Sequence, residues 1–241
     1  MSGPADVFAT AFNIVYLVVI WLISVLMGVR YSKQPQERRR ASRWLVAAVL
    51  SLALGDSFHL VARAYRTFTG VEAMIAPTLS WVGFGLFATS FTITLFYLFT
   101  LLYCWQKYDL QWGLFESALV VLFVIRLCLL LFPQNDWDGS TSAWKLYRNI
   151  PFTLAGLGVA WLLWRLSREP TRPHRKLLAA SAVVIVISFA CYIGTLVLTG
   201  VNPIFGMLML PKTVAYVLVA YWFLRIEFYP TAHKETGVDN G

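Results

Sequence analysis

Three ionisable residues interrupt an otherwise apolar stretch near the start of the chain. Asp56, His59 and Arg63 follow one another at intervals of three and four residues. On an α-helix this spacing places all three side chains on one face. At ~1.5 Å of rise per residue, His59 lies ~4.5 Å and Arg63 ~10 Å beyond Asp56 along the helix axis. A carboxylate and an imidazole at this spacing could act as a general acid–base pair.

Other apolar stretches carry polar residues at a similar predicted depth. Arg126 lies within one of them, Arg148 and Asn149 lie at the start of the next, and Lys212 follows Pro211 in the last. Ionisable residues inside an apolar segment are costly, so they face the interior of a bundle or a water-filled cavity. We therefore expect these residues to share one pocket with Asp56 and His59.

The charges expected in this pocket have a positive surplus, because Asp56 is the only acid among several cations. A buried positive surplus favours an anionic ligand, whose charge Arg126 and Lys212 would take, while Asp56 and His59 orient it or exchange a proton. Alternatively, Asp56 pairs with Arg126 or Lys212 only to neutralise buried charge. The predicted ligand-binding residues are Arg63, Tyr97, Arg126, Arg148, Asn149, Tyr192 and Lys212.

The composition indicates which elements must position these residues. Of the 241 residues, 59% are hydrophobic and 16% aromatic. Charged residues make up 13%, which is about half their share in an ordinary soluble domain. These values exclude a disordered chain and argue against a soluble globular protein. They predict an integral, multi-pass membrane protein.

Seven apolar stretches are long enough to cross a bilayer, which needs about 20 residues in a helix. A β-barrel would instead show short segments of alternating polarity. We therefore predict an all-α protein: one seven-helix membrane domain over residues 1–241, with a short cytoplasmic tail at 227–241. The predicted spans are 8–29, 44–64, 78–105, 113–132, 146–166, 177–199 and 204–226.

The distribution of Lys and Arg predicts the orientation of these spans. Fourteen of the 20 fall in alternate connections and the tail, and four in the connections on the other side. The positive-inside rule then places the N-terminus outside and the C-terminus in the cytoplasm, in a plasma or inner membrane. Topology thus accounts for the net charge of +8, so we expect no nucleic-acid partner. Membrane lipids are the expected partners of the basic loops, and the sequence carries no signal for an oligomeric state.

The connection at 133–145 is polar, contains two Trp residues and lies on the predicted outer side. Trp side chains suit the membrane interface. This segment could act as a lid over a cavity that opens outward.

Four functions fit these observations, led by binding or transport of an anionic or amphiphilic small molecule in an outward-facing pocket of spans 2, 4, 5 and 7. The second is a membrane-embedded, hydrolase-like enzyme acting on lipids, with Asp56 and His59 as catalytic residues. The third is a retinal-binding protein with a Schiff base at Lys212, and the fourth is a receptor or assembly factor without chemistry. We predict no metal site, because His174 and His233 fall on the opposite side from His59, and the leading function needs no cofactor.

Overall fold

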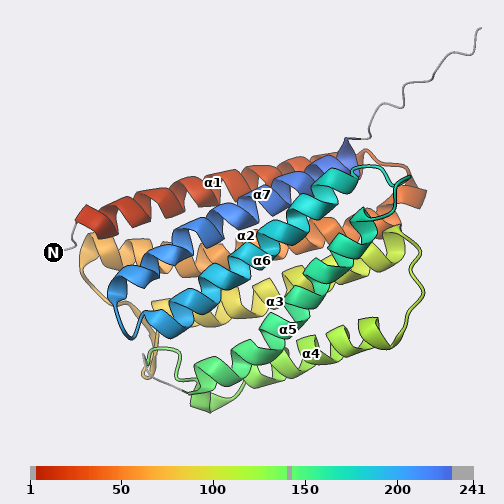
Figure 1. Cartoon of the computed structure of the whole chain (residues 1–241). Helices are drawn as coiled ribbons and strands as arrows, with labels where there is room; N and C mark the ends of the chain where they lie inside the picture. The colour runs from red at the N-terminus through yellow and green to blue at the C-terminus, as the bar shows by residue number, and fades with distance from the viewer. Residues whose placement is uncertain (1–3, 140–142, 230–241) are drawn as a thin grey trace, which may run out of the picture.

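The computed structural model describes residues 4–139 and 143–229, which fold into a bundle of seven α-helices (Figure 1). Each helix coincides with one predicted span, so the all-α class is confirmed. The α-helices are α1 (Pro4–Ser32), α2 (Gln36–Thr69), α3 (Trp81–Lys107), α4 (Leu114–Leu130), α5 (Trp144–Ser167), α6 (Arg175–Leu198) and α7 (Met209–Phe228). Short elements complete the fold: strands β1 (Met74–Ala76) and β2 (Leu79–Ser80), and 3₁₀ helices η1 (Pro133–Asn135) and η2 (Pro203–Leu208).

Six of the helical segments are long and apolar enough to cross a membrane, as expected of a membrane protein. They are α1, α2, α3, α5, α6 and the segment Ile204–Phe228, which joins most of η2 to α7. The helix α4 is shorter, with 17 residues. The apolar runs of the sequence therefore become helices, as expected where backbone groups must bond to one another.

The ends of the helices differ from the predicted spans for physical reasons. The helix α2 begins at Gln36, eight residues before the predicted span. Its first residues include several basic side chains, which end the apolar stretch of the sequence but do not prevent helical backbone hydrogen bonding. The last span begins as η2, so Pro211 lies in the first turn of α7, where a missing N–H costs no intrahelical bond. Pro211 therefore lies close to the junction between two helix types.

The helices form a closed ring in the order of the sequence. Neighbours from α1 to α7 pack side by side, α7 returns against α1, and α3 also contacts α5 (Figure 1). The core of buried apolar and aromatic side chains lies inside this ring. Polar residues on the inner faces of different helices are thereby brought together.

Two glycines set the close approach of α2 to α3. A Cβ atom at Gly55 would lie 1.7 Å from Thr92 Oγ1, and one at Gly85 would lie 2.7 Å from the Cα of His59. Small residues let neighbouring backbones approach closely, which favours helix association in membranes. This contact places the hydroxyls of α3 against the polar face of α2.

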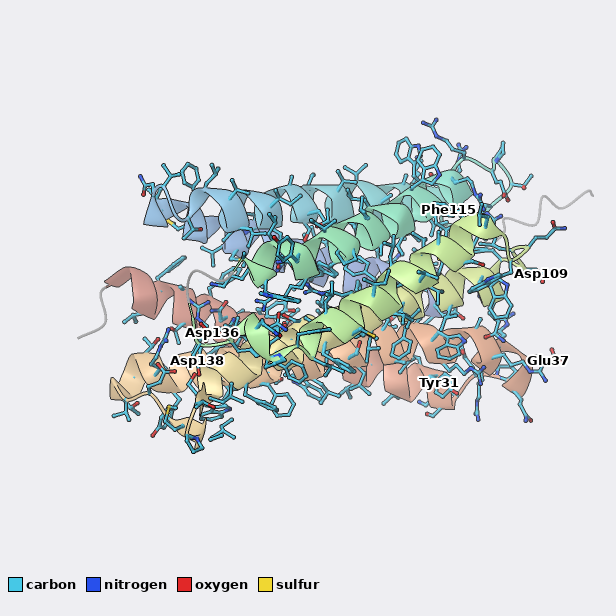
Figure 2. All side chains as sticks on the ribbon, turned by 90° about the horizontal axis from the view of Figure 1, so that it is seen from below. Tyr31, Glu37, Asp109, Phe115, Asp136 and Asp138 are labelled. Atoms are coloured by element: carbon cyan, nitrogen blue, oxygen red, sulfur yellow. The ribbon has the colours of Figure 1, made fainter. Side chains whose placement is uncertain are left out.

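The two ends of the bundle differ in their connections. The hairpin end carries the β1–β2 hairpin and the loop from α4 to α5, and the basic end carries the α1–α2, α3–α4 and α5–α6 connections. Figure 2 shows Asp136 and Asp138 toward the hairpin end and Tyr31, Glu37 and Asp109 toward the basic end. Residues 230–241 of the predicted tail lie outside the described residues, as do 140–142 of the predicted lid.

Candidate functional site

Asp56 is bound by hydroxyl groups from two neighbouring helices. Tyr16 of α1 donates its hydroxyl to Oδ2, and Thr89 Oγ1 of α3 donates to Oδ1 at 2.6 Å. Both carboxylate oxygens thus have neutral partners, and within the described residues Asp56 forms no ion pair. The alternative that Asp56 neutralises Arg126 or Lys212 through a direct pair does not hold in this arrangement.

Arg126 of α4 is buried, with 1% of its surface exposed. Its Nη1 donates to the backbone carbonyl of Arg148 and, at 2.9 Å, to Asn149 Oδ1. The guanidinium carbon lies 5.0 Å from the centre of the Phe152 ring, and Nε has no hydrogen-bond partner among the described residues. Every described partner of this buried cation is therefore neutral.

A proline in α5 lies close to the backbone carbonyl that accepts from Arg126. Pro151 lies inside the helix and lacks the N–H that would bond to the carbonyl of Tyr147 one turn earlier. The next carbonyl along the helix is that of Arg148, which accepts from Arg126. Freed or loosened carbonyls near a proline are commonly satisfied by neighbouring helices in membrane proteins.

Arg148 is also buried and held by neutral groups. Its Nη1 donates to Asn135 Oδ1 at 2.9 Å, and its guanidinium lies 4.0 Å from the centre of the Trp137 ring. Asn135 in turn donates Nδ2 to carbonyls at the end of α4, including that of Leu130 at 3.1 Å. Arg148 therefore ties the start of α5 to the loop that follows α4.

The described part of that loop is fixed at the hairpin end of the bundle (Figure 2). Trp137 packs edge-on against Phe87 of α3, with ring centres 5.5 Å apart. Asp138 accepts the backbone N–H of Ser80 at 2.7 Å and also the Ser80 hydroxyl. These contacts make residues 133–139 an anchored cover over the ends of α3 and α5, consistent with the predicted lid position.

Lys212 of α7 faces aromatic rings. Its Nζ lies 4.3 Å from the centre of the Tyr192 ring and 5.8 Å from that of Tyr216. Within the described residues it forms no ion pair, and its charge interacts through space with Asp56 and Arg126. Lys212 is thus the electrostatic link between the carboxylate and the buried guanidinium.

An aromatic layer connects Lys212 with Arg126. Phe152, which lies beneath Arg126, contacts Tyr97 and Tyr192 with ring centres 5.7 Å and 6.1 Å apart. Tyr97 is fully buried, and its hydroxyl lies 3.5 Å from that of Tyr216. The predicted residues Tyr97, Arg126, Arg148, Asn149, Tyr192 and Lys212 are therefore joined by continuous contacts, and Asp56 adjoins them through Lys212.

His59 interacts through space with Lys212 and Arg63 but takes no part in the hydrogen bonds described above. The Nδ1 of His59 is buried without a hydrogen-bond partner among the described residues, and the hydrogen bonds of Asp56 go to Tyr16 and Thr89. Arg63 is exposed nearer the hairpin end. The geometry does not join Asp56 to His59 as a bonded acid–base pair.

Sequence reasoning missed several partners. Tyr16 and Thr89 occur in apolar spans that contain no Asp, Glu, His, Lys or Arg, so nothing in the sequence singled them out. Asn135 and Trp137 belong to the predicted lid, but their contacts with Arg148 depend on how the loop folds back.

A second buried charged group lies near the basic end. Glu227, predicted to begin the tail, instead lies in the last turn of α7 and is 8% exposed. Its carboxylate accepts from Ser42 Oγ at 2.5 Å and Tyr103 Oη at 2.8 Å, and Lys107 Nζ lies 2.9 Å away. These four residues are called the Glu227 cluster.

Two hollows are lined by other residues than those predicted. One of about 410 Å³ and one of about 270 Å³ lie along α5 and α6, and the predicted site residues line neither of them. In the described part of the chain, His, Cys, Asp and Glu side chains do not gather in threes as a metal centre requires.

Comparison of the chain with protein-family models, curated protein sequences and solved structures gave no match.

Proposed function

We propose that this chain is a seven-pass membrane protein that binds or transports an anionic or amphiphilic small molecule. In this proposal α4 crosses the bilayer with the six longer segments. The basic end faces the cytoplasm, as the distribution of Lys and Arg favours, and the hairpin end faces outward across a plasma or inner membrane. The N-terminus then lies outside.

The observation that carries the proposal is the environment of Arg126. A cation that is 1% exposed has a backbone carbonyl and an amide oxygen as hydrogen-bond acceptors, and its Nε lacks a partner among the described residues. A buried charge is costly unless an opposite charge compensates it. The anionic group of a ligand near Arg126 and Lys212 would supply that charge.

The aromatic layer supports an amphiphilic rather than a purely ionic ligand. Phe152 and Tyr192 lie between the two cations and offer apolar surface beside them. A ligand with a carboxylate and a hydrocarbon part would match both features, with its charge at Arg126 and its chain on the rings. Asp56 would then tune the charge of Lys212.

The test is thermal unfolding of the purified protein in detergent with decanoate, with decanol as a ligand matched in chain length but uncharged. A ligand that binds only the native state stabilises it by mass action and so raises the unfolding temperature. At a ligand concentration 100 times Kd, the free energy of unfolding increases by about 2.7 kcal/mol. We expect decanoate to stabilise the protein and decanol to have little effect.

Matched variants localise the effect. In Arg126→Gln the stabilisation by decanoate should be lost, whereas Arg225→Gln, which removes an exposed Arg at the basic end, should retain it. Equal stabilisation of both variants would argue against a site at Arg126. Equal effects of decanoate and decanol would show that the protein responds to the chain and not to the charge.

A further inference from the structure

The helices α5 and α6 lie side by side in the ring (Figure 1). An apolar groove runs between them on the outer surface of the bundle. It has a volume of about 410 Å³ and is lined by residues that include Leu157, Trp161, Val183 and Val186. Trp161 is 57% exposed and Val186 is 48% exposed. On a membrane helix such side chains face lipid, so the groove matches the shape and polarity of an acyl chain.

The groove leads into a second hollow at the basic end. This hollow, of about 270 Å³, shares Trp164 with the groove and is lined by Ser167, Arg168, Arg175 and Lys176. The guanidinium of Arg168 lies 4.5 Å from the centre of the Trp164 ring. The apolar groove therefore lies next to three cationic side chains, which are placed at the end of α5 and the start of α6.

The cations around this hollow have no acidic partner within the described residues. The nearby Glu169 is paired with Arg172 of the same loop, and the other ion pairs lie elsewhere. Burial lowers the pKa of the His174 imidazole. At neutral pH the charge here therefore comes from Arg168, Arg175 and Lys176.

The start of α6 adds to the positive potential. The helix α6 begins with two cations, Arg175 and Lys176. Its first turn contains no acidic residue to balance them, and its N-terminus has no side-chain cap. By contrast, α2 has Glu37 in its first turn and α4 is capped by Glu116. Cations at the positive end of a helix dipole are unfavourable, and an anion there would relieve the repulsion.

We propose that the α5–α6 groove binds one anionic phospholipid, with its phosphate at Arg168, Arg175 and Lys176 and an acyl chain in the apolar groove. The two hollows lie on either side of the shared residue Trp164, so a single amphiphile could occupy both. A free phosphate would leave the groove empty, and a neutral lipid would leave the cations uncompensated. This site uses none of the predicted site residues around Arg126, so it stands or falls independently of the proposed function.

The test is native mass spectrometry of the full chain, exchanged into detergent with phosphatidylglycerol or phosphatidylcholine of the same acyl chains. We expect wild type to retain one phosphatidylglycerol in preference to phosphatidylcholine. The triple variant Arg168→Gln, Arg175→Gln, Lys176→Gln should lose about tenfold or more in retained phosphatidylglycerol, since each basic residue near an anionic headgroup contributes about fivefold. The variant Arg168→Lys, Arg175→Lys keeps the charge and should retain the lipid.

A matched triple variant separates a site from general surface charge. Lys33→Gln, Arg38→Gln, Arg40→Gln removes three exposed cations from the α1–α2 connection and the start of α2 at the same end, and should leave lipid retention unchanged. An equal loss in both triple variants would overturn the proposal. Displacement of the lipid by inorganic phosphate at equal concentration would also overturn it, because the apolar groove would then contribute nothing.

Discussion

Two of the buried charged groups among the described residues are compensated in opposite ways. In the Glu227 cluster, one carboxylate is met by a lysine and two hydroxyls, so its charge and both of its oxygens are satisfied. The other group, here called the Arg126–Lys212 group, joins these two cations through aromatic rings and neutral acceptors. Both lie among the helices of one ring, yet only in the Glu227 cluster is the buried charge paired with an opposite charge.

Under the proposed function, this difference separates a structural role of the Glu227 cluster from a binding role of the Arg126–Lys212 group. A paired buried charge stabilises the fold once formed, and removing one partner is strongly destabilising. A buried cation with neutral partners is a cost to the folded protein, and such costs are often found where a ligand binds. The comparison predicts effects of opposite sign for substitutions in the two groups.

The largest effect is expected at Glu227. The change Glu227→Leu leaves the buried hydroxyls of Ser42 and Tyr103 without their acceptor and Lys107 without its partner. We expect the free energy of unfolding to fall by about 2–4 kcal/mol, measured by thermal unfolding in detergent. The control Glu169→Leu removes an exposed carboxylate that pairs with the partly buried Arg172, and should cost less than about 1 kcal/mol. If both variants lose the same free energy of unfolding, the Glu227 cluster stabilises the fold no more than the Glu169–Arg172 pair does.

The next effect is expected at Arg126, with the opposite sign. Arg126→Met removes the buried charge while keeping much of the side-chain volume, so stability should stay unchanged or rise by about 1–2 kcal/mol. Stabilisation by decanoate should disappear in the same variant. Thermal unfolding with and without decanoate measures both quantities. A loss of stability as large as that of Glu227→Leu would mean that the two groups play the same structural role.

A smaller effect is expected at Asp56. In Asp56→Asn the amide oxygen can still accept from Tyr16 or Thr89, so stability should fall by about 1 kcal/mol. Loss of the negative charge that interacts with Lys212 should tighten decanoate binding a few-fold, as measured by titration. Thr89→Val removes one of the same hydrogen bonds without changing charge. If it tightens binding equally, the electrostatic explanation is wrong.

The smallest effect on stability is expected at Trp137. Trp137→Leu removes the ring over Arg148, an interaction of about 1 kcal/mol, and the edge contact with Phe87. A looser cover should speed the dissociation of decanoate more than it lowers the unfolding temperature. Stopped-flow dilution of the complex measures the rate, with Trp112→Leu at the basic end as the matched control. Unchanged dissociation would mean that the loop does not cover the path to the site.

The helices themselves could be predicted from the sequence, because a backbone in lipid must satisfy its own hydrogen bonds along every long apolar run. Their ends were less predictable. Basic residues from Arg38 to Arg43 interrupt the apolar pattern without interrupting α2, and Glu227 follows an apolar run without ending α7. A prediction based only on apolar residues therefore misplaces the start of α2 and the end of α7.

The sequence could single out candidate site residues, since ionisable side chains in apolar spans are rare, but it could not predict their partners. Asp56 bonds to Tyr16 and Thr89 because α1 and α3 present those hydroxyls to it. That choice depends on the rotation of three helices and on the close contact at Gly55 and Gly85. Spacing along one helix carries no information about the rotation of its neighbours.

The shortness of α4 has a consequence for the membrane around it. Its 17 residues span ~26 Å, whereas the hydrocarbon core of a bilayer is ~30 Å thick. If α4 crosses the bilayer as we propose, lipids beside it must thin by ~4 Å to match its length. Arg126 lies four residues before the last residue of α4, only ~6 Å of rise from that end. Headgroups and water therefore approach this guanidinium more closely than they would in a bilayer of full thickness.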